Sequence, residues 1–137
     1  MKRGFTMLEL VFVIVVLGIL ASIAVPRLFA TRDDAVIARA RADIASIRSA
    51  IVNMHNTNML SGRFTYPVSL ESGGGSGVLF DNVLQNGVKV DEKSGWSRDG
   101  GNYKFTLKGA STVFTYNATN GSFTCPRNDS LCRALTE

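Results

Sequence analysis

Hydrophobic residues fill the N-terminal part of the chain almost without interruption. From Phe5 to Val25 there are 21 residues without Lys, Arg or Asp, and the one acidic residue among them is Glu9. At ~1.5 Å of rise per helical residue, this run is about 32 Å long, enough to cross a hydrocarbon core of ~30 Å. The pattern predicts a transmembrane helix over residues 5–26.

A second hydrophobic pattern, with the period of an amphipathic helix, follows Pro26. Its apolar residues recur at spacings of three and four, so they share one stripe of a helix over residues 27–59. The stripe consists of Ile37, Ala40, Ile44, Ile47, Ile51 and Met54. Pro26 cannot donate a hydrogen bond to the carbonyl of Ser22, so we expect a kink or a loosened turn there. The stripe requires a small domain to cover it.

The remaining residues, 60–137, change from a loop composition to a period of two. Gly, Ser and Pro are dense between residues 60 and 77, which indicates a connecting loop, and we expect a short helical turn at 78–84. Alternating apolar and polar positions then predict half-buried strands. The expected strands cover residues 103–107, 112–116 and 122–125. We therefore predict an α+β fold in which an antiparallel meander of three or four strands packs on the helix.

The charge distribution argues against a nucleic-acid partner. The chain has 137 residues and a formal net charge of +4, with a pI near 9.4. Beyond residue 60, however, eight Lys or Arg face seven Asp or Glu, so the surplus lies in the first 60 residues. A basic patch on the exposed domain is therefore not expected.

The carboxylate of Glu9 needs an explanation, because a charge inside a membrane-spanning segment is costly and is a functional hypothesis by default. Three alternatives compete with a functional role. The run could be a secretory signal peptide, although it is long for one and lacks a clear cleavage site. It could be an ordinary anchor whose Glu9 reaches the interface, or Glu9 could simply favour the positive end of the helix dipole.

The segment Gly4-Phe5-Thr6-Met7-Leu8-Glu9 resembles the prepilin processing site of type IV pilins and of the pseudopilins of type II secretion and DNA uptake. This resemblance implies cleavage after Gly4 by a prepilin peptidase, which removes a leader of residues 1–4, and N-methylation of Phe5. It also implies a pilin-like fold. Gly18 and Pro26 fall where the family has a helix-loosening glycine and proline.

The resemblance also supplies a partner for Glu9. In the family, this carboxylate pairs with the N-terminal amine of a neighbouring subunit, here that of Phe5, which makes Glu9 an assembly residue. A buried charge is tolerable when it is paired, and the pair would fix the register of the helices. The implied partners are further copies or other pilin-like subunits, the peptidase and an inner-membrane assembly platform. Lys2 and Arg3 predict a cytoplasmic leader and a periplasmic C-terminal domain before assembly into a periplasmic or surface filament.

Two cysteines, Cys125 and Cys132, lie near the C-terminus with six residues between them. In an oxidising compartment this spacing favours a local disulfide, and a pair of free thiols is the alternative. Two thiolates and the distant His55 do not complete a tetrahedral metal site. The sequence around these cysteines also resembles the C-terminal disulfide region of type IV pilins.

The other candidate sites carry weaker signals. His55, the single histidine, is expected to be a solvated side chain and not a catalytic base. Asp91, Glu92 and Asp99 could form an oxygen cage, and the major pseudopilins bind calcium, but the spacing here does not match their loop. Trp96 is expected in the core or as a cover on a strand edge. No cofactor is expected, and no catalytic constellation is present.

The sequence therefore predicts a structural, non-enzymatic subunit of a type IV filament machine. A pseudopilin of type II secretion or DNA uptake is favoured by the short domain and the short cysteine loop. The alternatives are a subunit of a surface type IV pilus that serves adhesion or motility, a DNA-receptor minor pilin and an enzyme tethered by its N-terminus.

Overall fold

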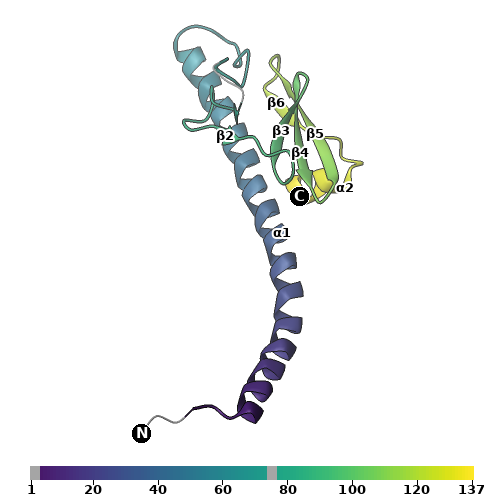
Figure 1. Cartoon of the computed structure of the whole chain (residues 1–137). Helices are drawn as coiled ribbons and strands as arrows, with labels where there is room; N and C mark the ends of the chain where they lie inside the picture. Colours follow the sequence, from purple (N-terminus) through teal and green to yellow (C-terminus); the bar gives the residue numbers. More distant parts are fainter. Residues whose placement is uncertain (1–3, 74–76) are drawn as a thin grey trace. The chain divides into compact units, whose positions relative to one another are not determined.

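The structure is a computed structural model that describes residues 4–73 and 77–137 (Figure 1). The chain divides into two compact units, an N-terminal unit (Met1–Ala35) and a C-terminal unit (Val36–Glu137). The division falls at residues 35 and 36, close to where the apolar stripe of the helix begins to be covered. Most of the predicted leader, residues 1–3, lies outside the described residues.

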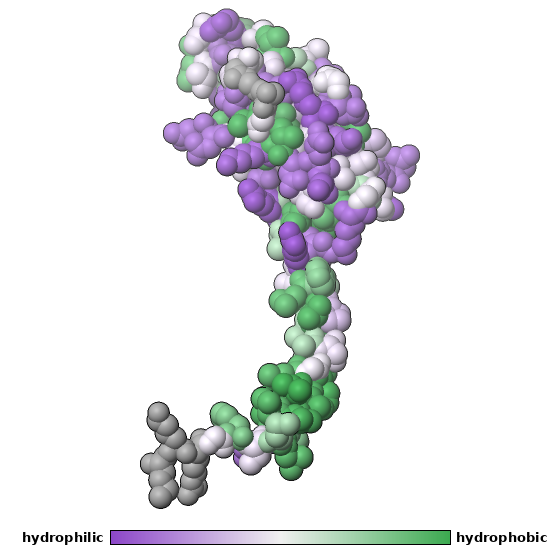
Figure 2. All heavy atoms as spheres, viewed as in Figure 1, coloured by the Kyte–Doolittle hydropathy of each residue, from purple (hydrophilic) through white to green (hydrophobic). Residues whose placement is uncertain are grey.

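The long helix α1 (Met7–Leu60) belongs to both units. In the N-terminal unit its apolar side chains are exposed, and the hydrophobic atoms gather on this part of the chain (Figure 2). Among the described residues, α1 is the helix that is long and apolar enough to cross a membrane. It continues without a break through Gly18 and Pro26, and the kink expected at these two positions stays a prediction.

In the C-terminal unit, α1 lies beside a small sheet (Figure 1). The predicted stripe is confirmed: Ala40, Ile44, Ile47 and Ile51 are each at most 2% exposed. Ile37 and Met54, at the two ends of the stripe, are half-buried. The spacing of three and four therefore identified the covered face of the helix.

Four strands form an antiparallel meander in the order β3-β4-β5-β6. The strands are β3 (Trp96–Asp99), β4 (Asn102–Leu107), β5 (Ala110–Asn117) and β6 (Ser122–Thr124). Burial alternates along β4, with Tyr103, Phe105 and Leu107 facing the core as the period of two predicted. The α+β fold with a long N-terminal helix and a small antiparallel sheet is confirmed.

An aromatic cluster fills the space between α1 and the sheet. Its members are Phe80, Trp96, Tyr103, Phe105, Phe114 and Phe123, each at most 4% exposed. Phe114 stacks on Phe123 with 5.0 Å between ring centroids, and Phe80 meets Trp96 edge-on at 5.5 Å. Trp96 is thus a core residue, the first of the two positions expected for it.

The short helical turn expected at 78–84 is confirmed in part: the amide of Leu84 donates to the carbonyl of Phe80 at 2.8 Å, as in one helical turn, but the segment begins as a strand. Val78–Leu79 forms strand β1, which pairs with β2 (Val88–Lys89) in a two-stranded ribbon. Phe80, with a positive φ of 60°, separates β1 from the turn that follows it. Just before β2, a side chain at Gly87 would overlap Val78, so only glycine allows this close approach.

A second helix, α2 (Ser130–Thr136), was not predicted. It occupies part of the segment between the two cysteines and continues beyond it. Asp129 is its N-cap and accepts a hydrogen bond from the amide of Leu131 at 3.1 Å. Leu131 and Leu135 enter the core, which explains why so short a helix is stable in this context.

Candidate assembly site

Thr6 and Glu9 form a reciprocal pair of hydrogen bonds at the start of α1. The amide of Thr6 donates to Oε2 of Glu9 at 3.0 Å, and the amide of Glu9 donates to Oγ1 of Thr6 at 3.2 Å. The carbonyl of Thr6 also accepts the first helical bond, from the amide of Leu10. This is a capping box, and it satisfies backbone amides that have no partner within the helix.

The capping box explains in part how the carboxylate of Glu9 is tolerated at the start of an apolar helix. One carboxylate oxygen accepts a hydrogen bond at the positive end of the helix dipole, so the charge is stabilised locally. Within the described residues, the other oxygen, Oε1, accepts no hydrogen bond, and the side chain is exposed. The carboxylate can therefore accept a donor from another molecule while it caps its own helix.

An apolar surface lies next to this carboxylate. A shallow depression of about 470 Å³ is lined by Leu8, Glu9, Val11, Phe12 and Val15. The apolar residues recur at helical spacing and offer a hydrophobic strip to lipid or to another helix. The depression therefore places one carboxylate beside an apolar surface.

The peptide bond between Gly4 and Phe5 precedes the helix and is accessible. Neither residue is helical, and Phe5 is 88% exposed. Peptidases cut most readily at exposed backbone outside helices and strands. The described part of the leader region therefore meets this condition, while cleavage and N-methylation at these residues stay predictions.

Two arginines of α1 donate hydrogen bonds to backbone carbonyls of α2 and β6. Nε of Arg41 donates to the carbonyl of Ala134 at 2.7 Å, and Nε and Nη2 of Arg48 donate to the carbonyl of Phe123 at 3.2 and 3.0 Å. Part of the positive charge that the sequence places on the helix is therefore engaged inside the unit. This use of the charge weakens further the case for a nucleic-acid surface.

The two cysteines are joined in a disulfide. The Cα atoms of Cys125 and Cys132 are 5.9 Å apart, and the bond connects the chain just after β6 to the first turns of α2. Cys132 is 1% exposed and Cys125 is half-buried against the core, so the bond lies at the edge of the packed core. It supplements the packing of α2 against the sheet.

The sequence led us to expect a solvated side chain at His55, and this expectation is wrong. Its ring stacks on Tyr66 at a centroid distance of 3.9 Å, and Nδ1 lies 3.1 Å from the carbonyl of Thr65. Tyr66 in turn passes so close to Gly121 that a side chain there would overlap its ring. His55 therefore fixes the loop after α1, a structural role.

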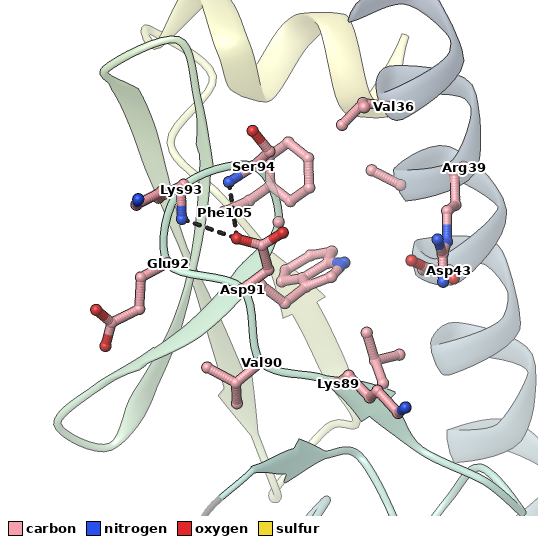
Figure 3. A pocket seen from close by; sticks show the side chains of 14 residues that line it. Val36, Arg39, Asp43, Lys89, Val90, Asp91, Glu92, Lys93, Ser94 and Phe105 are labelled. Atoms are coloured by element: carbon pink, nitrogen blue, oxygen red, sulfur yellow. Dashed lines mark hydrogen bonds between the residues drawn. The ribbon is translucent and has the colours of Figure 1, made fainter. Parts of the chain in front are cut away.

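The acidic residues proposed as an oxygen cage do not gather in the structure. Oδ1 of Asp91 accepts the amides of Lys93 at 3.0 Å and Ser94 at 3.2 Å (Figure 3), and these bonds lower its pKa. Across residues 4–73 and 77–137, no group of three or more His, Cys, Asp or Glu is placed to hold a metal ion. Calcium binding stays untested.

The start of this chain is similar to a known N-terminal motif. The family model for the prokaryotic N-terminal methylation motif matches residues 1–25, which include Gly4, Phe5, Glu9 and Gly18. Curated relatives extend the comparison. The type II secretion system core protein G of Pectobacterium carotovorum subsp. carotovorum is 48% identical over 50 residues, which are 36% of this chain and 32% of that protein.

Two further relatives are informative. Core protein G of Pseudomonas aeruginosa is 29% identical over 99 residues, covering 72% of this chain and 61% of the relative. The type IV narrow pilus major component PilA5 of Thermus thermophilus is 50% identical over 48 residues, 35% of this chain and 41% of that protein. The matched region thus spans from a third to about three fifths of these relatives. No solved structure matches the chain.

These matches confirm the resemblance of the chain to the type IV pilin and type II secretion pseudopilin family. That family consists of structural subunits and is not an enzyme family. Its members assemble with other pilin-like subunits, and the leader motif with the apolar helix suggests membrane anchoring before assembly.

Proposed function

We propose that this chain is a structural, non-enzymatic subunit of a type IV filament machine, and specifically a pseudopilin of type II secretion. The observation that carries the proposal is the exposed carboxylate of Glu9 at the start of an apolar helix, next to an accessible Gly4–Phe5 bond within a methylation motif. The similarity to core protein G of several bacteria supports the choice of machine.

Assembly would follow from the geometry of this site. Cleavage after Gly4 by a prepilin peptidase would create a positively charged amine on Phe5. Oε1 of Glu9, which is open within the described residues, would accept that amine from a neighbouring subunit, while Oε2 keeps its bond to Thr6. Apolar helices alone pack in many registers, so one charge pair per neighbour would select a single register.

The proposed location is the inner membrane, with the C-terminal unit in the periplasm until an assembly platform moves the subunit into a homomeric or mixed pseudopilus. The disulfide between Cys125 and Cys132 supports this placement, because such bonds persist in the oxidising periplasm.

A surface type IV pilus is the second candidate. The similarity to a pilus major component of Thermus thermophilus and the C-terminal disulfide favour it. DNA uptake has less support, because Arg41 and Arg48 are engaged in bonds within the C-terminal unit.

The mass of the mature chain tests the proposal. In cells with an active prepilin peptidase, we expect a chain that begins at Phe5 and carries one added methyl group. Cells without the peptidase provide the control and should retain Met1 to Gly4. A leader retained in both strains would contradict the proposal. Loss of protein secretion or of surface pili on deletion of the gene would then separate the two machines.

A further inference from the structure

The chain contains two Asn–Gly pairs, at residues 86–87 and 120–121, which share one covalent structure but have different surroundings. Asparagine is a thermolabile residue, and a following glycine makes it more so, because the absent Cβ lets the next backbone nitrogen approach the side-chain carbonyl. Both glycines have a positive φ, 62° at Gly87 and 72° at Gly121. The two pairs therefore differ chiefly in how the fold holds the groups that would react.

At the second pair, hydrogen bonds hold both of these groups. The amide of Gly121 donates to the carbonyl of Asn117 at 2.8 Å, and Oδ1 of Asn120 accepts from the amide of Ser122 at 3.0 Å. The nitrogen of Gly121 becomes nucleophilic only after it loses the proton that it donates to Asn117. This pair therefore has to open locally before its side chain and backbone can react.

At the first pair, neither group is held. Asn86 is exposed, and within residues 4–73 and 77–137 neither its side chain nor the amide of Gly87 makes a hydrogen bond. The β1–β2 ladder explains the free amide. The amide of Val90 donates to the carbonyl of Gly77, and the alternation of an antiparallel ladder then turns the amide of Gly87 away from β1.

The fold also requires the glycine of this pair. An added Cβ at position 87 would overlap Val78 and lie 2.7 Å from the carbonyl oxygen of Leu79. A substitution of Gly87 would therefore disturb the ribbon of β1 and β2. Asn86 carries no such constraint, because its side chain is exposed and unbonded.

We propose that Asn86 is a site of spontaneous deamidation in the folded protein, whereas Asn120 is protected. The backbone nitrogen of Gly87 loses its proton to a base in the solvent and attacks Cγ of Asn86. The bond from Cγ to Nδ2 breaks, and Nδ2 takes up a proton and leaves as ammonia, which closes a cyclic succinimide. Water then opens the ring at either of its carbonyls and gives aspartate or isoaspartate, each with a new negative charge.

This modification would weaken the ribbon of β1 and β2. The new carboxylate enters a turn that already carries Asp81, whose Cβ lies 3.3 Å from the position of a Cβ on Gly87. Isoaspartate also adds a methylene to the backbone just before β2, which displaces the pairing of Val88 with Leu79. Leu79 is 3% exposed, so the displacement would reach the core.

Storage of the detergent-solubilised full chain, followed by peptide mapping, tests the proposal. After reduction, trypsin places the two pairs in separate peptides, residues 64–89 and 109–127, and mass spectrometry locates the change from amide to carboxylate. We expect Asn86 to react roughly tenfold faster than Asn120, since opening the second pair costs about one or two hydrogen bonds. The rate at Asn86 should rise with pH, because the nitrogen of Gly87 must lose its proton.

The denatured, reduced chain is the control for the intrinsic chemistry, and Asn86 and Asn120 should react there at similar rates. Asn86→Gln should remain unmodified over the same period, because a glutamine would have to close a larger ring. During storage, the urea midpoint of the wild-type chain should fall, whereas that of Asn86→Gln should stay constant.

Two results would overturn the inference. Equal rates at Asn86 and Asn120 in the folded chain would show that the hydrogen bonds of the second pair give no protection. An Asn86 that stays an amide in the folded chain but reacts in the denatured chain would show that the fold protects the first pair as well. Neither result bears on the proposed function, because the inference does not depend on filament assembly.

Discussion

Arg41 donates a hydrogen bond to the carbonyl of Ala134, 2.7 Å away, and so connects α1 to the end of α2 across 93 residues of sequence. The carbonyls in the last turn of a helix have no partner within it and carry a partial negative charge. The guanidinium of Arg41 therefore supplies both a donor and a favourable charge where α2 needs them.

Replacement of Arg41 should destabilise the C-terminal unit. We expect Arg41→Ala to lower the free energy of unfolding by about 1 kcal/mol, because the bond is charge-assisted but exposed. Urea unfolding of the detergent-solubilised chain would measure this. Arg127→Ala, at an exposed arginine in the loop before α2, is the control and should change stability little. Equal effects of the two variants would show that the bond to Ala134 contributes nothing.

Loss of the disulfide should loosen α2 without affecting the membrane helix. We expect Cys125→Ser to lower the free energy of unfolding by roughly 2–3 kcal/mol on a loop-entropy model and to lower the abundance of the protein. Cys132→Ser and the double variant should match it, since each removes the same bond. Non-reducing peptide mapping of exported wild-type protein should recover residues 125 and 132 in one linked fragment. Two free thiols would contradict this prediction.

Elements with long periodic patterns were predictable from the sequence, because the same requirement, an apolar side chain at each position that faces the core, recurs many times. The stripe on α1 repeats over five helical turns, and the alternation along β4 repeats at every second residue. Short elements were not predictable. The ribbon of β1 and β2 has two residues in each strand, and α2 depends on core packing that no local pattern reveals.

The candidate site was predictable in part. Glu9 was conspicuous as a charge in an apolar run, but its bond with Thr6 was missed, although a Thr three residues before a Glu is the signature of a capping box. The bonds of Arg41 and Arg48 could not be predicted, because their carbonyl partners carry no side-chain signal and lie 93 and 75 residues away.

Gly121 should tolerate alanine poorly. Its φ of 72° strains any other residue, and an added Cβ would overlap the ring of Tyr66. Gly109 is a matched control, because its φ is 76° but nothing lies within 4 Å of an added Cβ. We expect Gly109→Ala to cost about 1 kcal/mol from strain and Gly121→Ala to cost roughly 2–4 kcal/mol from strain and overlap together. Thermal unfolding of both variants would measure the difference, and equal costs would contradict the close packing of Tyr66.

Two aspartates should affect the pH dependence of stability with opposite signs. The amides of Lys93 and Ser94 lower the pKa of Asp91, so its ionised form stabilises the fold above the unfolded-state pKa, and this contribution is lost as the pH falls through the lower folded-state pKa. Burial raises the pKa of Asp43, so its ionised form opposes folding once the pH exceeds the raised value.

At pH 7 we therefore expect Asp91→Asn to destabilise the C-terminal unit and Asp43→Asn to stabilise it. The Asp43 difference should shrink as the pH falls from the raised folded-state pKa towards the unfolded-state value near 3.8, and the Asp91 difference should shrink as the pH falls below 3.8 through the lowered folded-state pKa. Urea unfolding at a series of pH values would show this. A destabilised Asp43→Asn would mean that the carboxylate is compensated better than its burial indicates.

The substitution of Glu9 separates its two roles, as a cap for its own helix and as a partner for a neighbouring subunit. Gln at this position keeps a side-chain acceptor for the amide of Thr6, so Glu9→Gln should preserve the capping box but remove the charge. Glu9→Val removes both. Both variants should insert in the membrane at least as well as wild type, because a carboxylate in an apolar segment opposes insertion.

We expect both variants to be processed after Gly4, because the peptidase acts on the leader side, and both to fail in assembly. Without the carboxylate, the amine of Phe5 on the neighbouring subunit would be left unpaired in an apolar environment, and the helices would lose their register. Thr6→Ser is the control, since it keeps the capping box and the charge and should assemble. Processing is measured by mass spectrometry and assembly by the yield of sheared filaments. Normal filaments from Glu9→Gln would show that assembly does not need the charge of Glu9, and normal filaments from Glu9→Val would show that assembly needs neither the charge nor the cap.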